Sequence, residues 1–263
     1  MTTISLDDTA TVPGIRPVLA VRDASKRFGA VTALDGIDLE VRRGEVLALL
    51  GDNGAGKSTL IKCLSGVHRL DSGVIEMDGV PVAIHDPSDA RELGIETVYQ
   101  DLALFDNLRP TDNFFAGREL AGPAWLPRSL RLIRRKQMTA STREVLERLQ
   151  VELPDINACV GLMSGGQRQA VAVSRAAAFA SSVVILDEPT AALGVRESRR
   201  VLDLILRLRT DGKAVIVVSH AMDHVMEVAD RAVVMRRGRK VGELVPSAET
   251  YKEIVSLIVG GAE

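Results

Sequence analysis

Nine consecutive residues in the first quarter of the chain have the composition of a phosphate-binding loop. They follow the apolar run Val46 to Leu50 and precede a helix-like stretch that begins at Leu60. A strand, a glycine-rich turn and a helix start direct backbone N–H groups and the helix dipole at an anion. Lys57 is placed to reach the β- and γ-phosphates, and Ser58 to hold Mg²⁺. The pattern predicts a nucleoside triphosphate site rather than a plain turn, and its residues are Gly51, Asp52, Asn53, Gly54, Ala55, Gly56, Lys57, Ser58 and Thr59.

Two carboxylates follow a second apolar run, from Val183 to Leu186. We expect Asp187 to steer the coordination of Mg²⁺, directly or through water, and Glu188 to polarise the water that attacks the γ-phosphate. Paired acids can also simply cap the end of a strand. The presence of Lys57 and Ser58 in the same chain favours the catalytic interpretation.

Two further polar residues come directly after predicted strands. His220 follows the run from Ala214 to Ser219, and it is placed to donate a hydrogen bond to the γ-phosphate and to sense its loss. Gln100 follows a strand that ends at Tyr99, where it can meet Mg²⁺ and the attacking water. A lone histidine is usually structural, but the position at a strand end favours a functional role for both residues.

Ser164, Gly165, Gly166 and Gln167 open a predicted helix. Ser164 in the N-cap position and two glycines leave backbone N–H groups free, which makes a second anion-binding helix start. A simple helix cap explains these four residues equally well when they are taken alone.

The elements that carry these residues alternate between helix and strand. Strands are predicted over 18–21, 37–41, 46–50, 74–77, 80–83, 95–99, 183–186, 214–218 and 232–235, and helices over 88–93, 111–115, 136–149, 167–180, 197–209 and 222–229. Strands that alternate with helices predict an α/β fold with a parallel sheet, helices on its faces and a ligand at the carboxyl ends of the strands. The first quarter is rich in strands, and Asp78-Gly79 predicts a hairpin turn.

The predicted organisation is a loose, Thr-rich tail over residues 1–16 followed by one domain over 17–263. A helical subdomain with a bend at Pro123 and Pro127 interrupts the α/β core. The predicted α/β core, which includes a β subdomain, consists of residues 17–100 and 164–263. The predicted helical subdomain is residues 101–163.

Composition indicates an ordinary soluble globular protein. Of 263 residues, 46% are hydrophobic, and the formal charge of −2 gives no general attraction to nucleic acid or anionic lipid. Cys63 and Cys159 lack the spacing of metal ligands and imply no disulfide framework, and we expect Cys63 to pack in the core. The charge-free stretch from Ala176 to Leu186 is shorter than the ~20 residues of a membrane helix, and the first residues do not have the pattern of a signal peptide.

Together these motifs resemble the ATP-binding cassette ATPases over residues 18–245. The resemblance rests on the order of the phosphate loop, Gln100, Ser164 to Gln167, the run Leu186 to Thr190, and His220. It implies a P-loop nucleoside triphosphate hydrolase with a mainly parallel central sheet, an antiparallel β subdomain and an inserted helical subdomain. ATP and Mg²⁺ are the implied ligands. Phe28, an aromatic residue ahead of the phosphate loop, is implied to stack on adenine.

The resemblance also implies that the Ser164 segment binds the γ-phosphate of ATP held by the opposite subunit. One copy of each motif per chain then implies a head-to-tail homodimer with two ATP molecules at its seam, closed by ATP and reopened by hydrolysis. Two residues depart from the family pattern. Met163 replaces the usual leucine, and Gly194 stands where an aspartate usually links the two sites, so communication through that carboxylate is in doubt.

A narrower resemblance, over residues 99–104 and 188–198, is to the ATPase subunits of bacterial monosaccharide importers, closest to the fructose-type subunits that carry one cassette per chain. It implies a peripheral position on the cytoplasmic face of the cell membrane, under a permease that receives sugar from an extracytoplasmic binding protein. Leu104 to Phe115 is the predicted permease-docking groove, although Phe114 and Phe115 can instead be core residues. A basic run is expected to be a solvated face rather than a lipid contact: Arg128, Arg131, Arg134, Arg135 and Lys136.

Three other classes of protein share parts of this pattern. A soluble cassette ATPase that acts on nucleic acid or ribosomes is expected to have paired cassettes, coiled coils or a basic surface, and the sequence shows none of these. An exporter ATPase is normally fused to membrane helices. A non-hydrolytic scaffold would lack Glu188 or His220. We therefore expect an importer subunit with no nucleic-acid partner.

Overall fold

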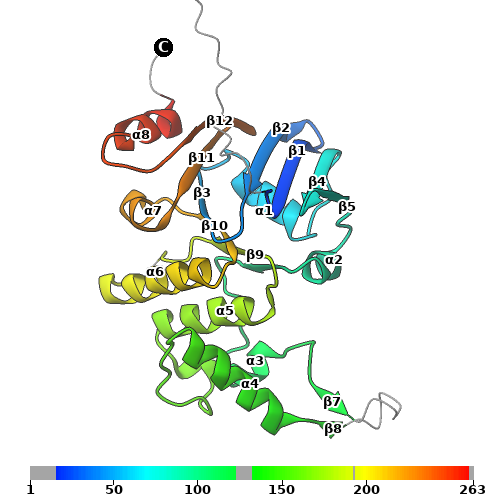
Figure 1. The fold of residues 1–263 in the computed structure, drawn as a ribbon, viewed down its shortest axis with the longest axis vertical. Coiled ribbons are helices and arrows are strands. Elements are labelled where there is room, and N and C mark those ends of the chain that lie inside the picture. Colours follow the sequence, from blue (N-terminus) through cyan, green and yellow to red (C-terminus); the bar gives the residue numbers. More distant parts are fainter. Residues whose placement is uncertain (1–15, 123–131, 192, 261–263) are drawn as a thin grey trace, which may run out of the picture.

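The computed structural model describes residues 16–122, 132–191 and 193–260. In these ranges the chain folds into a mainly parallel sheet flanked by helices, a separate antiparallel sheet and a helical region at one end of the molecule (Figure 1). The α/β fold class predicted from the sequence is confirmed.

The central sheet has six strands among the described residues, in the order β12-β11-β3-β10-β9-β6. Neighbouring strands are parallel, except for β11 and β12. Each residue of β3 and β10 is buried, as expected for parallel strands that are covered on both faces. The strands are β3 (Val46–Leu50), β6 (Ile95–Val98), β9 (Val183–Asp187), β10 (Ala214–Val218), β11 (Arg231–Arg236) and β12 (Arg239–Leu244).

The register of these strands brings their carboxyl ends together. Val218 of β10 pairs with both Asp187 of β9 and Leu49 of β3, and Val98 of β6 pairs with Leu186. The four segments that follow these strands therefore begin at one edge of the sheet. All four carry residues that the sequence assigned to the nucleotide site.

Alternate residues of the central strands face opposite layers. In β9, Val183 and Ile185 join a core cluster with α1 and the antiparallel sheet, whereas Val184 and Leu186 join a cluster with α5 and α6. Cys63 of α1 is buried and free, as predicted. The helices around the sheet are α1 (Lys57–Leu64), α2 (Pro87–Glu92), α5 (Gly165–Phe179), α6 (Val195–Thr210), α7 (Met222–Val228) and α8 (Tyr251–Val259).

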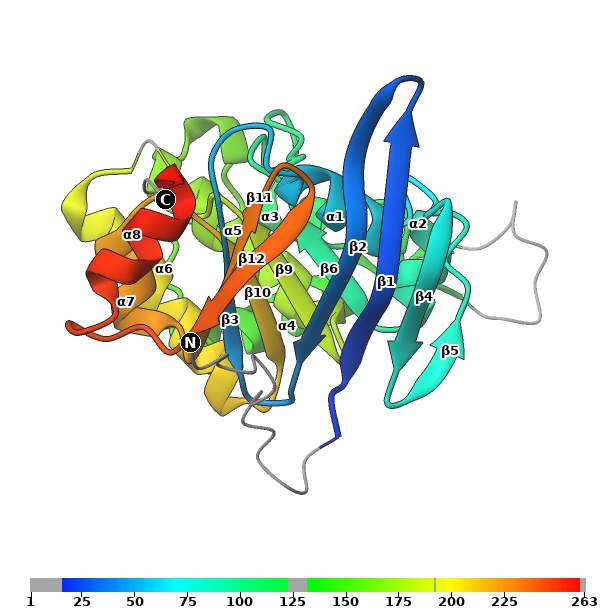
Figure 2. The same cartoon turned by 90° about the horizontal axis from the view of Figure 1, so that it is seen from above.

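The antiparallel sheet has the order β2-β1-β4-β5 and lies to one side of the central sheet, with α6, α7 and α8 on the other side (Figure 2). The predicted turn at Asp78-Gly79 joins β4 to β5, and both turn residues have positive φ. The first two strands are longer than predicted because exposed polar residues break the apolar pattern beyond their buried segments. The strands are β1 (Leu19–Phe28), β2 (Val31–Val41), β4 (Ser72–Met77) and β5 (Val80–Val82).

The helical region has a hydrophobic cluster of its own. It contains α3 (Pro110–Phe114), α4 (Arg135–Arg148) and the short 3₁₀ helix η2 (Val160–Leu162), and it packs against α5. Phe114 and Phe115 are 2% and 5% exposed, so the alternative that these two are core residues is correct. The subdomain boundaries themselves stay a prediction.

Several elements were not predicted. The strand β12 and the helix α8 were missed, and so was a small ladder of β7 (Ala121–Gly122) and β8 (Leu132–Ile133). Some predictions fall outside the described residues: most of the tail, the bend at Pro123 and Pro127, and Arg128 and Arg131 of the basic run. In the described ranges no helix combines the length and apolar composition that crossing a bilayer requires.

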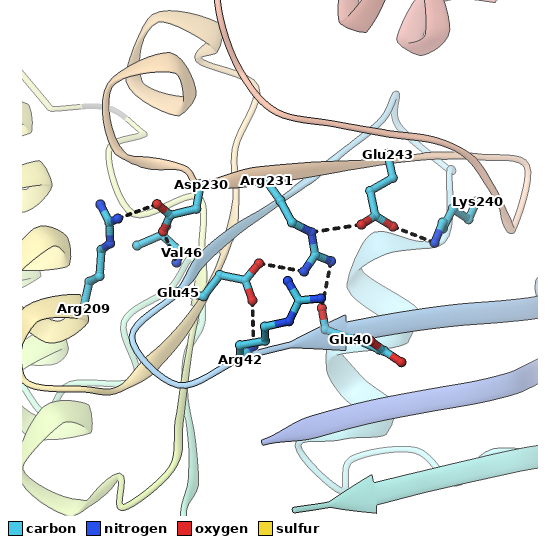
Figure 3. A network of polar contacts seen from close by, with 9 residues as sticks. All are labelled: Glu40, Arg42, Glu45, Val46, Arg209, Asp230, Arg231, Lys240 and Glu243. Carbon is cyan, nitrogen blue, oxygen red and sulfur yellow. Dashed lines mark hydrogen bonds and ion pairs between the residues drawn. The ribbon is translucent and has the colours of Figure 1, made fainter. Parts of the chain in front are cut away.

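A network of charged residues fixes the amino-terminal end of β3 (Figure 3). Glu45 accepts hydrogen bonds from Arg231 Nη1 and from the backbone N–H of Arg42, both at 2.7 Å. Asp230 pairs with Arg209 at 2.6 Å and accepts from the backbone N–H of Val46 at 2.9 Å. The network thus ties β3 to β11 and α6 at the end of the sheet opposite to the phosphate loop.

Candidate functional site

A cleft of about 450 Å³ lies at the carboxyl edge of the central sheet. It is the place where the structure brings together most of the residues that the sequence assigned to the nucleotide. Those that line it are Phe28, Asn53, Gly54, Ala55, Gly56, Lys57, Ser58, Thr59, Gln100, Asp187, Glu188 and His220.

The glycines of the phosphate loop are required by its geometry. Gly51 has φ +145°, and a Cβ there would overlap the carbonyl oxygen of Met235. Gly56 has φ +104°, and its Cβ would lie 2.5 Å from the carbonyl oxygen of Ala33. Gly56 is also the N-cap of α1, where no side chain caps the helix. The first N–H groups of α1 are therefore directed at the cleft without a side-chain acceptor, as an anion site requires.

The side chain of Lys57 folds back over the preceding residues of the phosphate loop. Its ammonium donates to the carbonyl oxygens of Gly51 at 2.7 Å and Asp52 at 3.0 Å. Burial lowers the pKa of Lys57, and the nearby carboxylates of Glu188 and Asp187 oppose that shift. The side chain thus places a positive charge inside the cleft, where phosphate oxygens can replace its backbone acceptors.

Glu188 is held in a strained conformation. Its φ is +52°, in the left-handed region that non-glycine residues rarely adopt, and its backbone N–H donates to the carbonyl oxygen of Val218 at 2.9 Å. His220 Nε2 lies 3.1 Å from Glu188 Oε1. Although this distance is within ion-pair range, the buried Oε1 atom has no hydrogen-bond partner among the described residues. Glu188 thus directs Oε1 at His220, where that atom is shielded from solvent, while the side chain lines the cleft.

Burial raises the pKa of Asp187 and of Glu188. Lys57 opposes the shift at Asp187, and His220 opposes it at Glu188. A raised pKa makes a carboxylate a stronger base, which suits a residue that must attract a proton from water.

The donor set fits Mg²⁺ bound together with phosphates. Within the described ranges, no three side chains of His, Cys, Asp or Glu form a cluster that could enclose a metal ion. Ser58, Gln100 and Asp187 line the same cleft and offer oxygen ligands. Mg²⁺ usually takes one or two protein ligands beside substrate phosphates and water, which is what this edge of the sheet can provide.

Phe28 stands at the outer part of the cleft and is 44% exposed. Its ring packs edge-on against His68, with 5.1 Å between the ring centroids. His68 is not among the site residues predicted from the sequence. The role of Phe28 in stacking on a base stays a prediction.

Ser164 does not line the cleft that contains Lys57. It caps α5 in a capping box, in which Gln167 N–H donates to Ser164 Oγ at 3.3 Å and Ser164 N–H donates to Gln167 Oε1 at 2.9 Å. With Gly166 and Gln167 it lines a second groove, of about 420 Å³. The cap interpretation is thus satisfied, and within one chain the segment from Ser164 to Gln167 lies apart from the phosphate loop.

Gly194 is the N-cap of α6, and a carboxylate lies beside it. A Cβ at position 194 would be 2.7 Å from Glu197 Oε2. The side chain of Glu197 also covers Gly166, where an added Cβ would lie 2.5 Å from Glu197 Cγ. A negative charge is therefore present near this loop even though residue 194 lacks one.

Two polar contacts around the site were not predicted from the sequence. Thr190 Oγ1 lies 3.0 Å from His224 Nδ1, and Arg175 donates to the carbonyl oxygens of Leu102 and Ala103. No local pattern indicated His224, because its partner Thr190 lies 34 residues away in the chain. For Arg175 the signal was a lone charge in an otherwise apolar helix segment.

Comparison with known proteins gives one consistent result. A family model described as ABC transporter matches residues 34–191. The chain is 48% identical over 248 residues to the fructose import ATP-binding protein FrcA of Rhizobium meliloti, covering 94% of this chain and 95% of that protein. It is 45% identical over 245 residues to the xylose/arabinose import ATP-binding protein XylG of Sulfolobus acidocaldarius, covering 93% and 95%. The structure of a nucleotide-free ATP-binding cassette from an ABC transporter matches with a TM-score of 0.76 and 25% identity, covering 92% and 97%.

Proposed function

The chain belongs to the ABC transporter family, and we propose on that premise that it is the ATP-hydrolysing subunit of an importer for a simple sugar. The observation that carries the proposal is the cleft in which Lys57, Asp187, Glu188 and His220 meet. The relatives named for the import of fructose and of xylose and arabinose, which match this chain over nearly their whole length, support a monosaccharide as the solute.

Binding of ATP rests on the phosphate loop and its helix. The uncapped N–H groups of α1 and the ammonium of Lys57 receive the β- and γ-phosphates, while Phe28 offers its exposed ring to adenine. Ser58, with Asp187 and Gln100 directly or through water, would hold Mg²⁺, which neutralises charge on the phosphates.

Hydrolysis rests on the strained turn after β9. Glu188, which lines the cleft, accepts a hydrogen bond from the attacking water through its carboxylate and orients that water. His220, which is beside this carboxylate, donates to the γ-phosphate and responds when it is lost. Preorganised charge and orientation, rather than covalent chemistry, thus supply the catalysis.

We infer that two copies assemble head to tail. Ser164 and Gly166 lie in a groove separate from the phosphate loop of their own chain, so the start of α5 is available to a nucleotide held by a second copy. A two-fold arrangement makes two such composite sites at once. ATP then closes the dimer, and hydrolysis reopens it.

The permease contact is assigned to a groove of about 320 Å³ between α2, β6, α3 and α5. Phe105, Asn113 and Phe114 of the segment from Leu104 to Phe115 line it. Phe105 is 54% exposed and offers an apolar contact to a helix of a membrane subunit. The chain would then act at the cytoplasmic face of the cell membrane, below a permease that receives its sugar from an extracytoplasmic binding protein, with no nucleic acid as partner.

The test is co-purification of the tagged full-length chain from its native cells, with Phe105→Glu as a matched variant. The proposal expects a membrane permease and a sugar-binding protein with the wild type and a weaker permease signal with the variant. ATPase activity of the two isolated proteins should be equal. Recovery of ribosomes, DNA or RNA in place of a permease would refute the transport assignment.

A further inference from the structure

The segment directly after Gln100 has an unusual backbone. Leu102 and Ala103 have φ values of +60° and +45°, so two consecutive non-glycine residues occupy the left-handed region. Steric overlap of Cβ with the backbone makes this conformation unfavourable, and it persists only where surrounding contacts hold it. The local hydrogen bonds are Leu102 N–H to Tyr99 O at 2.9 Å and Ala103 N–H to Asp101 O at 2.8 Å.

Arg175 of α5 holds this segment from outside. Its Nη1 donates to the carbonyl oxygen of Ala103 at 2.8 Å, and its Nη2 donates to that of Leu102 at 3.0 Å. The planar fork of a guanidinium suits two adjacent acceptors and fixes their relative orientation. Arg175 thus donates hydrogen bonds to the carbonyl oxygens of the two strained residues.

The surroundings of Arg175 show that charge pairing is not its role. Across the described ranges, no ion pair is formed by its guanidinium, and the nearby Glu96 pairs instead with Arg118 at 2.7 Å. Burial lowers the pKa of Arg175, and the proximity of Arg118 and Arg91 adds to that shift against the pull of Glu96. Burying a cation near other cations costs free energy, and hydrogen bonds to the buried group are needed to offset that cost.

We propose that Arg175 is a positioning residue that makes the placement of Gln100 depend on helix α5. The same helix is capped by Ser164, so in the proposed dimer these two hydrogen bonds of Arg175 join Gln100 of one composite site to the Ser164 segment of the other. Arg175, Ala103 and Phe105 also line the groove assigned above to the permease, so a segment in that groove contacts Arg175 directly. This inference rests on the proposed function. It adds that a permease segment bound in the groove alters the position of Gln100 through Arg175.

The test compares Arg175→Met, which removes the donors and keeps an extended side chain, with the wild-type full-length protein. Loss of two charge-assisted hydrogen bonds is expected to reduce kcat at least ~10-fold, with KM for ATP within ~2-fold. Amide hydrogen exchange over residues 99–105 should become faster. Arg143→Met, at an exposed arginine of α4, is the matched control and should change neither quantity.

Two further variants separate positioning from general damage. Ala103→Gly in the Arg175→Met background should recover part of kcat, because glycine takes a positive φ without a steric cost. In a Gln100→Ala background, Arg175→Met should reduce kcat little further, because both changes act through Gln100. Should Arg175→Met fail to fold, Arg175→Lys with and without Ala103→Gly takes its place.

Unchanged kcat and unchanged exchange over residues 99–105 in the Arg175 variant would overturn the proposal. A full additional loss of kcat in the Gln100→Ala background would also overturn it, since Arg175 would then act elsewhere. The exchange measurement needs no nucleotide. It can therefore show that Arg175 holds residues 99–105 in place even if the wild type proves to be no importer subunit. Failure of the proposed function is seen instead in the co-purified partners.

Discussion

Arg231→Met should destabilise the protein in a pH-dependent manner. Arg231 pairs with Glu45 at 2.7 Å and with Glu243 at 2.9 Å, and its Nη2 donates to the carbonyl oxygen of Glu40 at 3.2 Å (Figure 3). Glu45 is 7% exposed. Removing one partner of a buried pair leaves the other charge uncompensated, at a typical cost of about 3 to 5 kcal/mol. Because Glu45 keeps the N–H of Arg42 and Glu243 keeps Lys240, we expect about 3 kcal/mol.

The sign of the pH dependence follows from the pKa of Glu45. Burial already raises that pKa, and Arg231 provides the main opposing effect, so the variant raises it further. A carboxyl group whose folded-state pKa exceeds its unfolded value is least destabilising at low pH, where it is protonated, and destabilises increasingly as pH rises through the folded-state pKa. The difference in stability between wild type and variant should therefore be larger at pH 8 than at pH 5.

The assay is urea unfolding of both proteins at these two pH values, with Glu45→Gln and the double variant completing a cycle. Arg231→Met combined with Glu45→Gln should be more stable at pH 8 than Arg231→Met alone, because no buried charge remains unpaired at position 45. A loss below ~0.5 kcal/mol, the range of ordinary surface substitutions, would refute the reasoning. So would a loss that is the same at both pH values.

Three other outcomes are expected. Glu188→Gln should bind ATP and stall as a dimer, with turnover at least ~100-fold lower in a phosphate-release assay; unchanged turnover would remove Glu188 from the mechanism. Gly194→Asp adds a carboxylate beside Glu197 and should change the Hill coefficient of ATP turnover, and more so when combined with Glu197→Gln; identical coefficients in all variants would show that a carboxylate here is immaterial. Burial raises the pKa of Cys63 to about 11, so iodoacetamide at pH 7.5 should label Cys159 in the folded protein and Cys63 only after denaturation, as mass spectrometry can check.

The predictions that succeeded depend on signals contained in short segments. The strand β3, the phosphate loop and α1 follow one another within residues 46–64, and each glycine there has a positive φ. The register of parallel strands then brings Gln100, Asp187 and His220 to the same edge as Lys57, which the alternation of strands and helices already indicated.

The features that were missed involve residues far apart in the chain or segments with weak patterns. Thr190 and His224 are 34 residues apart, and Arg175 is 72 residues from Ala103, so no local pattern contains either contact. The strand β12 is half exposed, with no fully buried residue, and therefore lacks an apolar run. The extents of β1 and β2 were underestimated because exposed polar residues interrupt the apolar pattern beyond their buried segments.

The proposed mechanism requires each chain to supply half of each of two composite ATP sites. The most direct test measures ATP hydrolysis per chain over a wide range of protein concentration, together with molar mass in the presence of MgATP. Specific activity should fall on dilution in step with the loss of dimer. Full activity per chain in a solution shown to contain only monomers would contradict the account.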